Sequence, residues 1–445
     1  MSSFTKAGSK RKASEHLDAP SNVGPTLKVA KIHSFFGKKT EPTLSGSYKW
    51  LDPLGPALSC LHGVNLNPKP STKVAAFDLD GTLIKSDFGI GSSRKASTST
   101  PTAAPSWEWW RASIPAKLKE VIDSGFTVVI ISNQALKPAA LKAWKLKISS
   151  IAAALPDVPF RLFAASAKDG YRKPMPGMWT ELERIFVEDG VTIDKAQSFF
   201  VGDAAGRQYT GTKSDFSSTD RKWALNVDIS FLTPEEYFLK LPPHTNFTLP
   251  GFNVSSLPTD LPTITPTSSP LLPHPPKQEL VLFVGYPCLG KTTFFRSHFE
   301  PAGYIHINQD TLKTRDKCVK EMQRHLQDGK SCVIDNTNRN ATTRKYYVDV
   351  ANQLKVSTRC FYFMGSIELA WHNNLYRTFN LPPSVATVES KRELVPYIGF
   401  SGFRDSFEGP SLEEGFREVK KVNWVFKGTL EEKKYWSMWL QIDGK

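Results

Sequence analysis

Short apolar runs alternate with amphipathic stretches through residues 46–240, and this alternation predicts a first folded domain. The pattern predicts three strands and two helices, namely strands at Lys73–Phe77, Thr127–Ile131 and Ser198–Val201 and helices at Ile114–Ser124 and Ala139–Leu155. Strands that alternate with helices in this way favour an α/β fold, in which helices cover both faces of a parallel sheet.

A second alternation of the same kind begins abruptly at Glu279. It predicts three further strands and a helix, at Glu279–Val284, Tyr304–Asn308, Ser331–Ile334 and Glu368–Phe379. Residues 241–277 separate the two patterns and are rich in Pro, Ser and Thr, which is typical of a semi-rigid linker. The second domain is therefore predicted at residues 278–445.

Two segments lack any sustained periodicity. Residues 1–45 are rich in Ser, Lys, Gly and Pro, a composition that predicts a disordered basic tail. Residues 89–105 form a low-complexity insertion in the first domain, and we assign it no function.

Charge and cysteine content narrow the class of protein. Lys and Arg number 57 against 43 Asp and Glu, and the formal net charge of +14 favours a polyanionic partner, unless the excess belongs mainly to the tail. No apolar run approaches the roughly 20 residues that span a bilayer, so we expect no membrane segment. The five cysteines are scattered and include no CxxC pair, which argues for a reducing compartment and against a disulfide framework or a zinc site: Cys60, Cys288, Cys318, Cys332 and Cys360.

The first candidate site begins with two aspartates at the end of a predicted strand. Asp78 and Asp80 follow the apolar run that ends at Phe77, and the edge where parallel strands end is where open α/β sheets bind ligands. A carboxylate there can attack phosphorus and form an aspartyl phosphate, and a second can protonate the leaving oxygen and later activate water. Asp78 is the candidate nucleophile and Asp80 the candidate acid and base; the alternative is a pair of loop-capping aspartates.

Further polar residues follow in the order that such a site needs. Ser132 and Asn133 end the next predicted strand and can hold phosphoryl oxygens, and Lys173 can offset the charge of nucleophile and phosphate. Asp203, after another strand, can complete a Mg²⁺ site with Asp78 and the Asp80 carbonyl, because Mg²⁺ prefers oxygen ligands.

Two more acidic residues lie beyond Asp203. Asp215 and Asp220 are candidates for outer contacts to the same site. For Asp220, an acidic residue in the first turn of a helix is the interpretation that the sequence favours.

The second candidate site is a phosphate-binding loop. Residues 285–292 read GYPCLGKT and match GxxxxGK[ST] between a predicted strand and a helix-like stretch. In this context backbone N–H groups cradle phosphates, Lys291 reaches the β- and γ-phosphates, and Thr292 binds Mg²⁺. Gly285, Gly290 and Thr293 complete the predicted ATP contacts of the loop.

Charged residues after this loop supply the remaining chemistry of a kinase. Asp310 follows a predicted strand and can accept the proton of an attacking hydroxyl. Asp335 ends another strand, where it positions metal or substrate or simply caps the strand. Arg377 on the predicted helix Glu368–Phe379 can neutralise charge on the transferring phosphoryl group. Arg392 and Arg404 are either solvated or available to contact nucleic-acid phosphates.

These motifs resemble known families. The set from Asp78 to Asp203 resembles the haloacid dehalogenase superfamily of phosphotransferases. The segments Tyr171-Arg172-Lys173-Pro174, 201–207, 285–292, Asn308-Gln309-Asp310 and 335–338 together resemble the eukaryotic polynucleotide kinase 3′-phosphatases, across roughly residues 46–435. Only a short tail precedes the first domain in this sequence, so we expect a form without the forkhead-associated domain of the animal members.

The resemblance implies an architecture and an activity. A Rossmann-like phosphatase without a large cap would precede a P-loop kinase with a parallel sheet and a helical lid, and the protein would be a monomer that uses Mg²⁺ and ATP. It would remove 3′-phosphates through an aspartyl phosphate and phosphorylate 5′-hydroxyls at DNA ends. An uncapped site is open, which also favours a macromolecular substrate.

The tail carries two short motifs that agree with action on DNA. Lys10-Arg11-Lys12 is a candidate nuclear import signal, which predicts a nuclear protein. Ile32, Phe35 and Phe36 share one face of a helical turn and resemble the motif that binds the sliding clamp, although Val29 stands in place of its leading glutamine. The alternative is a chance apolar cluster.

Other functions remain open from the sequence. One alternative is end healing of RNA, another is a metabolite kinase fused to a phosphatase, and a third is a catalytically inactive scaffold. The intact acidic and basic residues of both candidate sites argue against the scaffold. Trp107, Trp109 and Trp110 lie near the first site and either stack on an unpaired base or, as the sequence favours, pack the short flap after the first motif.

Overall fold

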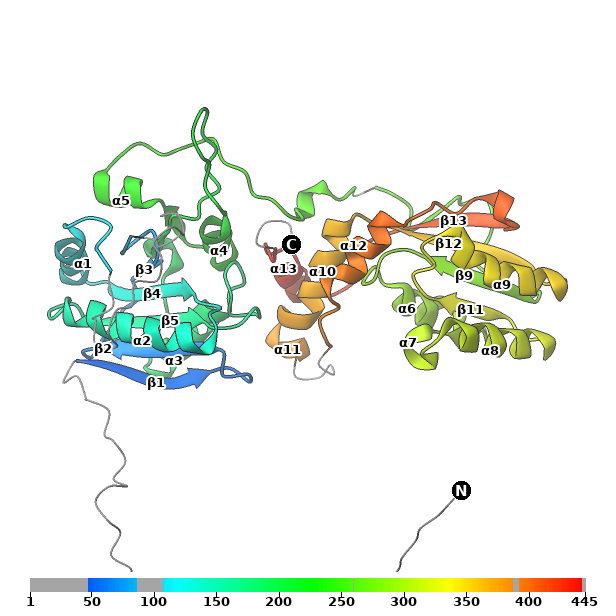
Figure 1. Ribbon diagram of the computed structural model, residues 1–445, viewed down its shortest axis with the longest axis horizontal. Helices are drawn as coiled ribbons and strands as arrows, with labels where there is room; N and C mark the ends of the chain where they lie inside the picture. The colour runs from blue at the N-terminus through cyan, green and yellow to red at the C-terminus, as the bar shows by residue number, and fades with distance from the viewer. Residues whose placement is uncertain (1–46, 86–106, 259, 387–391, 442–445) are drawn as a thin grey trace, which may run out of the picture. The chain divides into compact units, whose positions relative to one another are not determined.

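The computed structural model describes residues 47–85, 107–258, 260–386 and 392–441 (Figure 1). These described residues belong to one compact unit. The tail motifs and the insertion at 89–105 lie outside the described residues. Within the described ranges, no helix is both long and apolar enough to cross a membrane. All five cysteines are free, as their scattered spacing predicts.

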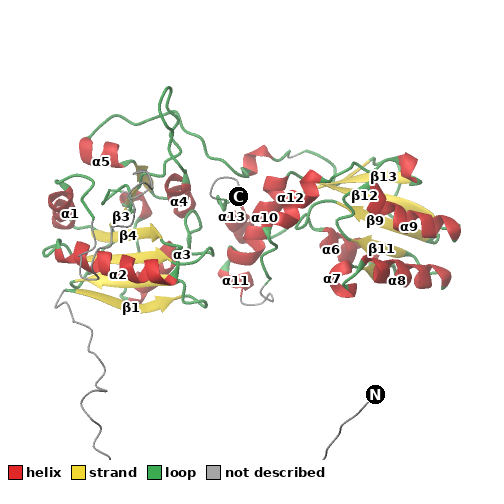
Figure 2. Ribbon diagram, viewed as in Figure 1, coloured by secondary structure: helices red, strands yellow, loops and turns green. Residues whose placement is uncertain are grey.

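The first half of the chain, residues 47–240, is built on a seven-stranded sheet (Figure 2). Its strands, in spatial order, are β1 (Tyr48–Leu54), β2 (Cys60–Asn65), β5 (Phe160–Ala165), β4 (Thr127–Asn133), β3 (Val74–Phe77), β6 (Phe199–Val201) and β7 (Ser230–Leu232). The strands from β5 to β7 are parallel, whereas β2 pairs antiparallel with both β1 and β5. The prediction of a parallel sheet is therefore wrong at this edge, because β1 and β2 are joined by a short turn and need no crossover helix.

Helices cover both faces of this sheet, as the alternating pattern predicts. They are α1 (Ile114–Asp123), α2 (Pro138–Ala153), α3 (Gly177–Glu188), α4 (Thr219–Val227) and α5 (Pro234–Leu239), with the 3-10 turn η2 (Lys195–Gln197) before β6. Side chains alternate along β3: Ala75 and Phe77 pack with α1, α2 and α5, and Val74 and Ala76 pack with α3 and α4. Both faces of β3 are fully buried, which explains its continuous apolar run.

The second half, residues 278–441, forms a second sheet together with the short strand β8 from the preceding segment, six strands in all. The spatial order is β10 (Ile305–Ile307), β11 (Cys332–Asp335), β9 (Glu279–Val284), β12 (Ser357–Met364), β13 (Glu418–Asn423) and β8 (Ile264–Thr265). The first five strands are parallel, and the short β8, from the segment predicted as a linker, pairs antiparallel with β13. The predicted α/β class is confirmed for both halves.

Helices again cover both faces of the second sheet. They are α6 (Lys291–Phe294), the π-turn η4 (Phe295–Phe299), α7 (Gln309–Leu312), α8 (Arg315–Gln327), α9 (Ala341–Gln353), α10 (Ile367–Phe379), α11 (Pro383–Ala386), α12 (Tyr397–Asp405) and α13 (Leu430–Trp436), with 3-10 turns η3 (Val254–Ser256) and η5 (Leu412–Glu414). One hydrophobic cluster joins β9 to α8 and α9, and the other joins it to α10, α12 and α13.

The three tryptophans near the first site pack against the domain core. Trp107 donates from Nε1 to Ser150 Oγ at 3.0 Å and meets Trp109 edge-on, with ring centroids 4.7 Å apart. Trp110 lies against Phe238, at a centroid distance of 6.0 Å. The interpretation that they pack the short flap after the first motif is confirmed, because Trp109 pairs with Ile84 and all three pack against the core.

Candidate active sites

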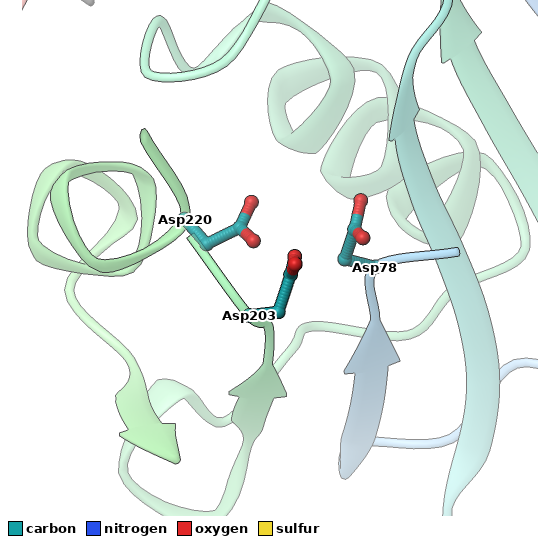
Figure 3. Close-up of side chains that lie close together, drawn as sticks. All are labelled: Asp78, Asp203 and Asp220. Carbon is teal, nitrogen blue, oxygen red and sulfur yellow. The ribbon is translucent and has the colours of Figure 1, made fainter. Parts of the chain in front are cut away.

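The first site lies where β3 and β6 end side by side. Asp78 follows β3 directly, and its backbone N–H donates to Val201 O of β6 at 2.8 Å. Asp203 follows β6, and Asp220 enters from the first turn of α4 (Figure 3). One carboxylate oxygen from each aspartate lies within 4.8 Å of the other two. The fold therefore brings Asp78 together with two aspartates that lie more than a hundred residues later in the sequence.

Two glycines allow these aspartates to approach. Gly81 has φ +88°, and a Cβ there would lie 2.2 Å from Asp203 Oδ2. A Cβ on Gly202 would lie 2.5 Å from Asp220 Oδ2. Larger residues at either position would collide with a carboxylate, which gives a physical reason for the Gly in the segments DxDGT and GD.

Lys173 neutralises part of this acidic cluster. Its Nζ donates to Asp78 Oδ1 at 2.6 Å, to Asp220 Oδ1 at 2.7 Å and to Ile131 O at 2.9 Å. Burial alone would lower the pKa of Lys173, but the carboxylates of Asp220 and Asp78 outweigh burial and raise the pKa, so the ammonium stays charged.

The cluster has more negative charge than its lysine can balance. Burial raises the pKa of Asp78 to about 7, Lys173 opposes that rise, and Asp220 adds to it. Burial, followed by the charges of Asp78 and Asp220, also raises the pKa of Asp203. Three buried or half-buried carboxylates face one ammonium group. The excess negative charge that remains is one that a divalent cation would cancel. Oxygen donors from three aspartates fit Mg²⁺, which prefers such ligands.

The end of β4 holds the other predicted phosphate contacts. The Asn133 amide spans the backbone of Lys173, because its Nδ2 donates to Lys173 O at 3.1 Å and its Oδ1 accepts from Lys173 N at 2.9 Å. The structure therefore gives this side chain a positioning contact, whereas the sequence predicts a phosphate contact. Ser132 is buried beside the site, and Gln134 Nε2 donates to Ser132 Oγ at 3.0 Å and to Asp80 Oδ2 at 2.5 Å.

Three side chains at this site receive too little weight from the sequence. Asp220 does lie in the first turn of a helix, as predicted, but it also pairs with Lys173, a contact that only the fold creates. Gln134 hydrogen-bonds Asp80, although nothing in the sequence spacing identifies Gln134 as a site residue. Asp215 accepts from Arg207 N at 3.0 Å and Arg207 Nε at 2.9 Å, which anchors the loop after β6.

The second site is the loop between β9 and α6. Gly285 has φ +150° and Gly290 has φ +83°, and a Cβ on Gly285 would lie 2.9 Å from Phe363 Cβ. Lys291 Nζ donates to Gly285 O at 3.1 Å and Tyr286 O at 2.6 Å, so the lysine closes the loop. Burial lowers the pKa of Lys291, against the opposing charge of Asp335.

Thr292 and Asp335 meet beneath this loop. Thr292 Oγ1 donates to Asp335 Oδ2 at 2.6 Å, and His306 Nε2 lies 2.9 Å from the same oxygen. Burial alone would raise the pKa of Asp335, but the hydrogen bonds from His306 and Thr292 outweigh burial and lower the pKa. A carboxylate beside the loop threonine suits a Mg²⁺ site. The sequence gives no sign of His306, which contacts Asp335 only through the pairing of β10 with β11.

One cavity of about 890 Å³ joins the predicted kinase residues. It is lined by the phosphate-binding loop, by Asp310 at the start of α7, and by Trp424 and Phe426 after β13. Because β10 and β13 lie on opposite sides of β9, Asp310 and Trp424 flank the loop from opposite sides. The cavity can therefore hold a donor nucleotide and an acceptor on either side of a transferring phosphate.

Two arginines also line the cavity. Arg377 Nη2 donates to Asn374 Oδ1 at 3.2 Å, while its Nε, although buried, has no partner among the described residues. Arg392 also lines this cavity. Arg404, by contrast, pairs with Asp405 at 2.9 Å on the exposed side of α12.

His372, on the same helix as Arg377, predicts a pH dependence of stability. Its Nε2 donates to Trp436 O at 2.6 Å, and its Nδ1 is buried without a partner among the described residues. Burial lowers its pKa from 6.5 to about 4. Between pH 6.5 and pH 4 the unfolded chain therefore binds a proton at His372 that the folded chain does not bind. Over that window the free energy of unfolding should fall by about 3 kcal/mol on account of this group.

The measurement is the thermal unfolding midpoint at pH 7 and pH 5 for the wild type and for His372→Gln, whose amide can keep the bond to Trp436 O. We expect the variant to lose less stability on acidification than the wild type. An equal loss in both proteins would contradict the assignment. His274→Gln, at an exposed histidine before β9, is the control.

Comparisons with known proteins agree with this pair of sites. The family model described as polynucleotide kinase 3 phosphatase matches residues 73–238. A bifunctional polynucleotide phosphatase/kinase of Schizosaccharomyces pombe is 37% identical over 378 residues, which cover 84% of this chain and 84% of that protein. A protein of Acanthamoeba polyphaga mimivirus is 32% identical over 410 residues, or 85% of this chain and 91% of that protein.

A third relative matches a smaller part of the chain. The polynucleotide 3′-phosphatase ZDP of Arabidopsis thaliana is 34% identical over 186 residues, which are 38% of this chain and 24% of that protein. The similarity to the fission yeast enzyme spans both sheets and includes both sites. On this ground the chain belongs to the family of bifunctional polynucleotide phosphatase/kinases.

Proposed function

We propose that this protein heals DNA strand breaks by removing 3′-phosphates at the first site and phosphorylating 5′-hydroxyls with ATP at the second. One observation carries the proposal: a single chain holds a buried Asp78–Lys173–Asp220 cluster on one sheet and a phosphate-binding loop facing Asp310 on the other. A break with a 3′-phosphate and a 5′-hydroxyl needs both reactions before it can be sealed.

At the first site, Asp78 is the nucleophile. Its carboxylate attacks phosphorus, the bond from phosphorus to the 3′-oxygen breaks, and Asp80 gives its proton to that oxygen. Asp80 then takes a proton from water, which hydrolyses the aspartyl phosphate and frees Asp78. Lys173 balances the negative charge of Asp78 and the phosphoryl group, and Ser132 holds the phosphoryl oxygens. Gln134 orients Asp80. Asp78, Asp203 and the Asp80 carbonyl would hold Mg²⁺, which would further stabilise the negative charge of the phosphoryl group.

At the second site, the acceptor and the nucleotide approach from opposite sides of the loop. Asp310 accepts the proton of the 5′-hydroxyl as its oxygen attacks the γ-phosphorus, and the bond to the β-phosphate oxygen breaks. Lys291 and Arg377 stabilise charge on the transferring group. The loop from Gly285 to Thr293 holds the ATP phosphates, and Thr292 with Asp335 suits Mg²⁺.

The tail and the net charge support a nucleic-acid partner and a nuclear location. The net charge of +14 suits a nucleic-acid partner. Lys10-Arg11-Lys12 supports a nuclear location, and Ile32, Phe35 and Phe36 support docking on the sliding clamp. We propose that the protein acts as a monomer. The runner-up, healing of RNA ends, uses the same chemistry.

The substrate class is tested by presenting one 3′-phosphate in three settings: at a nick in duplex DNA, at the same nick in RNA, and on a nucleoside 3′-monophosphate. We expect kcat/KM on the DNA nick to exceed that on the mononucleotide by at least about 100-fold, because contacts to the polymer stabilise the transition state. Equal rates on the mononucleotide would make the protein a metabolite enzyme. A preference for the RNA nick would favour the runner-up.

A further inference from the structure

The loop that carries Lys173 is also part of the second half's interior. Met175, two residues after Lys173, is 6% exposed and belongs to the same hydrophobic cluster as the residues of β9 and α10. At the other end of this loop, Gly170 lies so close to α10 that a Cβ there would be 2.8 Å from Phe379 O. The phosphatase lysine is thus flanked on both sides by contacts with the kinase half.

A single side chain ties this loop to the end of the chain. Asn226, on α4, donates from Nδ2 to Pro174 O at 2.7 Å and to Trp439 O at 2.7 Å. Its Oδ1 accepts from Trp439 N at 2.7 Å. The amide therefore joins three segments: the helix that carries Asp220, the residue next to Lys173, and the backbone after α13.

The segment after α13, residues 437–441, is itself fixed to both halves, and we call it the C-terminal clasp. Lys222, on α4 and fully buried, donates to Gln441 O at 3.0 Å. Gln441 Nε2 donates to Glu368 O of α10 at 2.6 Å, and its Oε1 accepts from Phe252 N at 3.1 Å. Buried polar groups of this kind are costly to leave unpaired, so the clasp holds its place firmly.

Lys173 is therefore connected to the clasp in two ways, through its own backbone and through its partner Asp220. Its own backbone continues into Pro174, and its carboxylate partner Asp220 lies on the helix that carries Lys222 and Asn226. If the first-site chemistry is as proposed above, Lys173 must stay within hydrogen-bond distance of Asp78 while charge develops. We propose that the C-terminal clasp of the kinase half positions Lys173 for 3′-phosphate removal, with Asn226 and Met175 as the positioning residues. Neither residue touches the phosphate; both act through Lys173.

The test measures kcat and KM of both reactions in the full-length chain for wild type and Asn226→Ala. We expect the phosphatase kcat to fall by roughly tenfold, because small misplacements of a catalytic group cost one to two orders of magnitude. The phosphatase KM and both kinase constants should stay within about twofold of wild type. Asn246→Ala removes an exposed hydrogen bond from the side-chain amide to Gln208 O. It is the matched control and should change none of these constants.

A second pair separates positioning from general destabilisation. Met175→Ala should lower the phosphatase kcat in the same way, and Met175→Leu, which refills the cluster, should restore it. An unchanged phosphatase kcat in Asn226→Ala or in Met175→Ala would overturn the proposal. So would a parallel fall of both activities in Asn226→Ala and Met175→Ala. Failure of the wild type to dephosphorylate DNA would instead defeat the proposed function, which keeps the two outcomes distinct.

Discussion

Replacing Asp78 by asparagine is expected to lower the rate of 3′-phosphate removal by about 10,000-fold, the size of effect seen when a nucleophile is removed. The amide keeps the shape of the side chain but cannot attack phosphorus. It also removes the charge that pairs with Lys173 Nζ at 2.6 Å. Because Asp220 still pairs with Lys173, the buried ammonium keeps one partner, and the fold should survive.

The same preparation provides an internal control for this result. Phosphorylation of 5′-hydroxyl ends by Asp78→Asn should remain within about twofold of wild type, because the residue lies on the other sheet. Asp123→Asn, which neutralises an exposed aspartate on α1, should leave both activities unchanged. Retention of substantial phosphatase activity by Asp78→Asn would assign the nucleophile to another group.

Replacing Lys291 by alanine is expected to lower 5′-phosphorylation by about 1,000-fold, because charge on the transferring phosphate loses its nearest cation. In the structure Lys291 Nζ bonds the carbonyls of Gly285 and Tyr286, so the lysine also shapes the loop. Lys291→Met, which keeps the volume without the charge, separates the two contributions. We expect it to be as inactive as the alanine variant.

Controls for this second result come from the first site and from the surface. Removal of 3′-phosphates by Lys291→Ala should stay within about twofold of wild type. Lys345→Ala, at an exposed lysine on α9, should affect neither reaction. If Lys291→Met phosphorylated 5′-ends at the wild-type rate, the loop would not be the ATP site.

Much of the fold could be predicted because buried parallel strands leave a clear pattern. The run before Asp78 is apolar throughout because both faces of β3 are covered, and the strand Glu279–Val284 is observed with the predicted bounds. The edge strands β1 and β2 leave a weaker signal, because β1 is half exposed. Phe252 and β8 show that a Pro-rich segment can still supply core residues, which composition alone does not reveal.

The residues of the candidate sites also differ in how well the sequence predicts them. Residues at strand ends, such as Asp78 and Asp203, could be selected from the sequence because the carboxyl ends of parallel strands share one edge. Gln134 and His306 could not, because their partners are set by the fold and by strand pairing. Asp220 is a candidate outer contact from the sequence, but its ion pair with Lys173 is set by helix packing. Asn226 and Met175 are the extreme case, since their contacts lie in the other half of the chain.

The central claim, that one chain repairs both termini of a break, is tested most directly on a single substrate. We would incubate wild-type protein, Mg²⁺ and γ-labelled ATP with a nicked DNA duplex that carries a 3′-phosphate and a 5′-hydroxyl. We predict that the 3′-phosphate is lost, that the 5′-end gains the label, and that DNA ligase then seals the nick. A nick that keeps its 3′-phosphate or gains no 5′-label would contradict the claim.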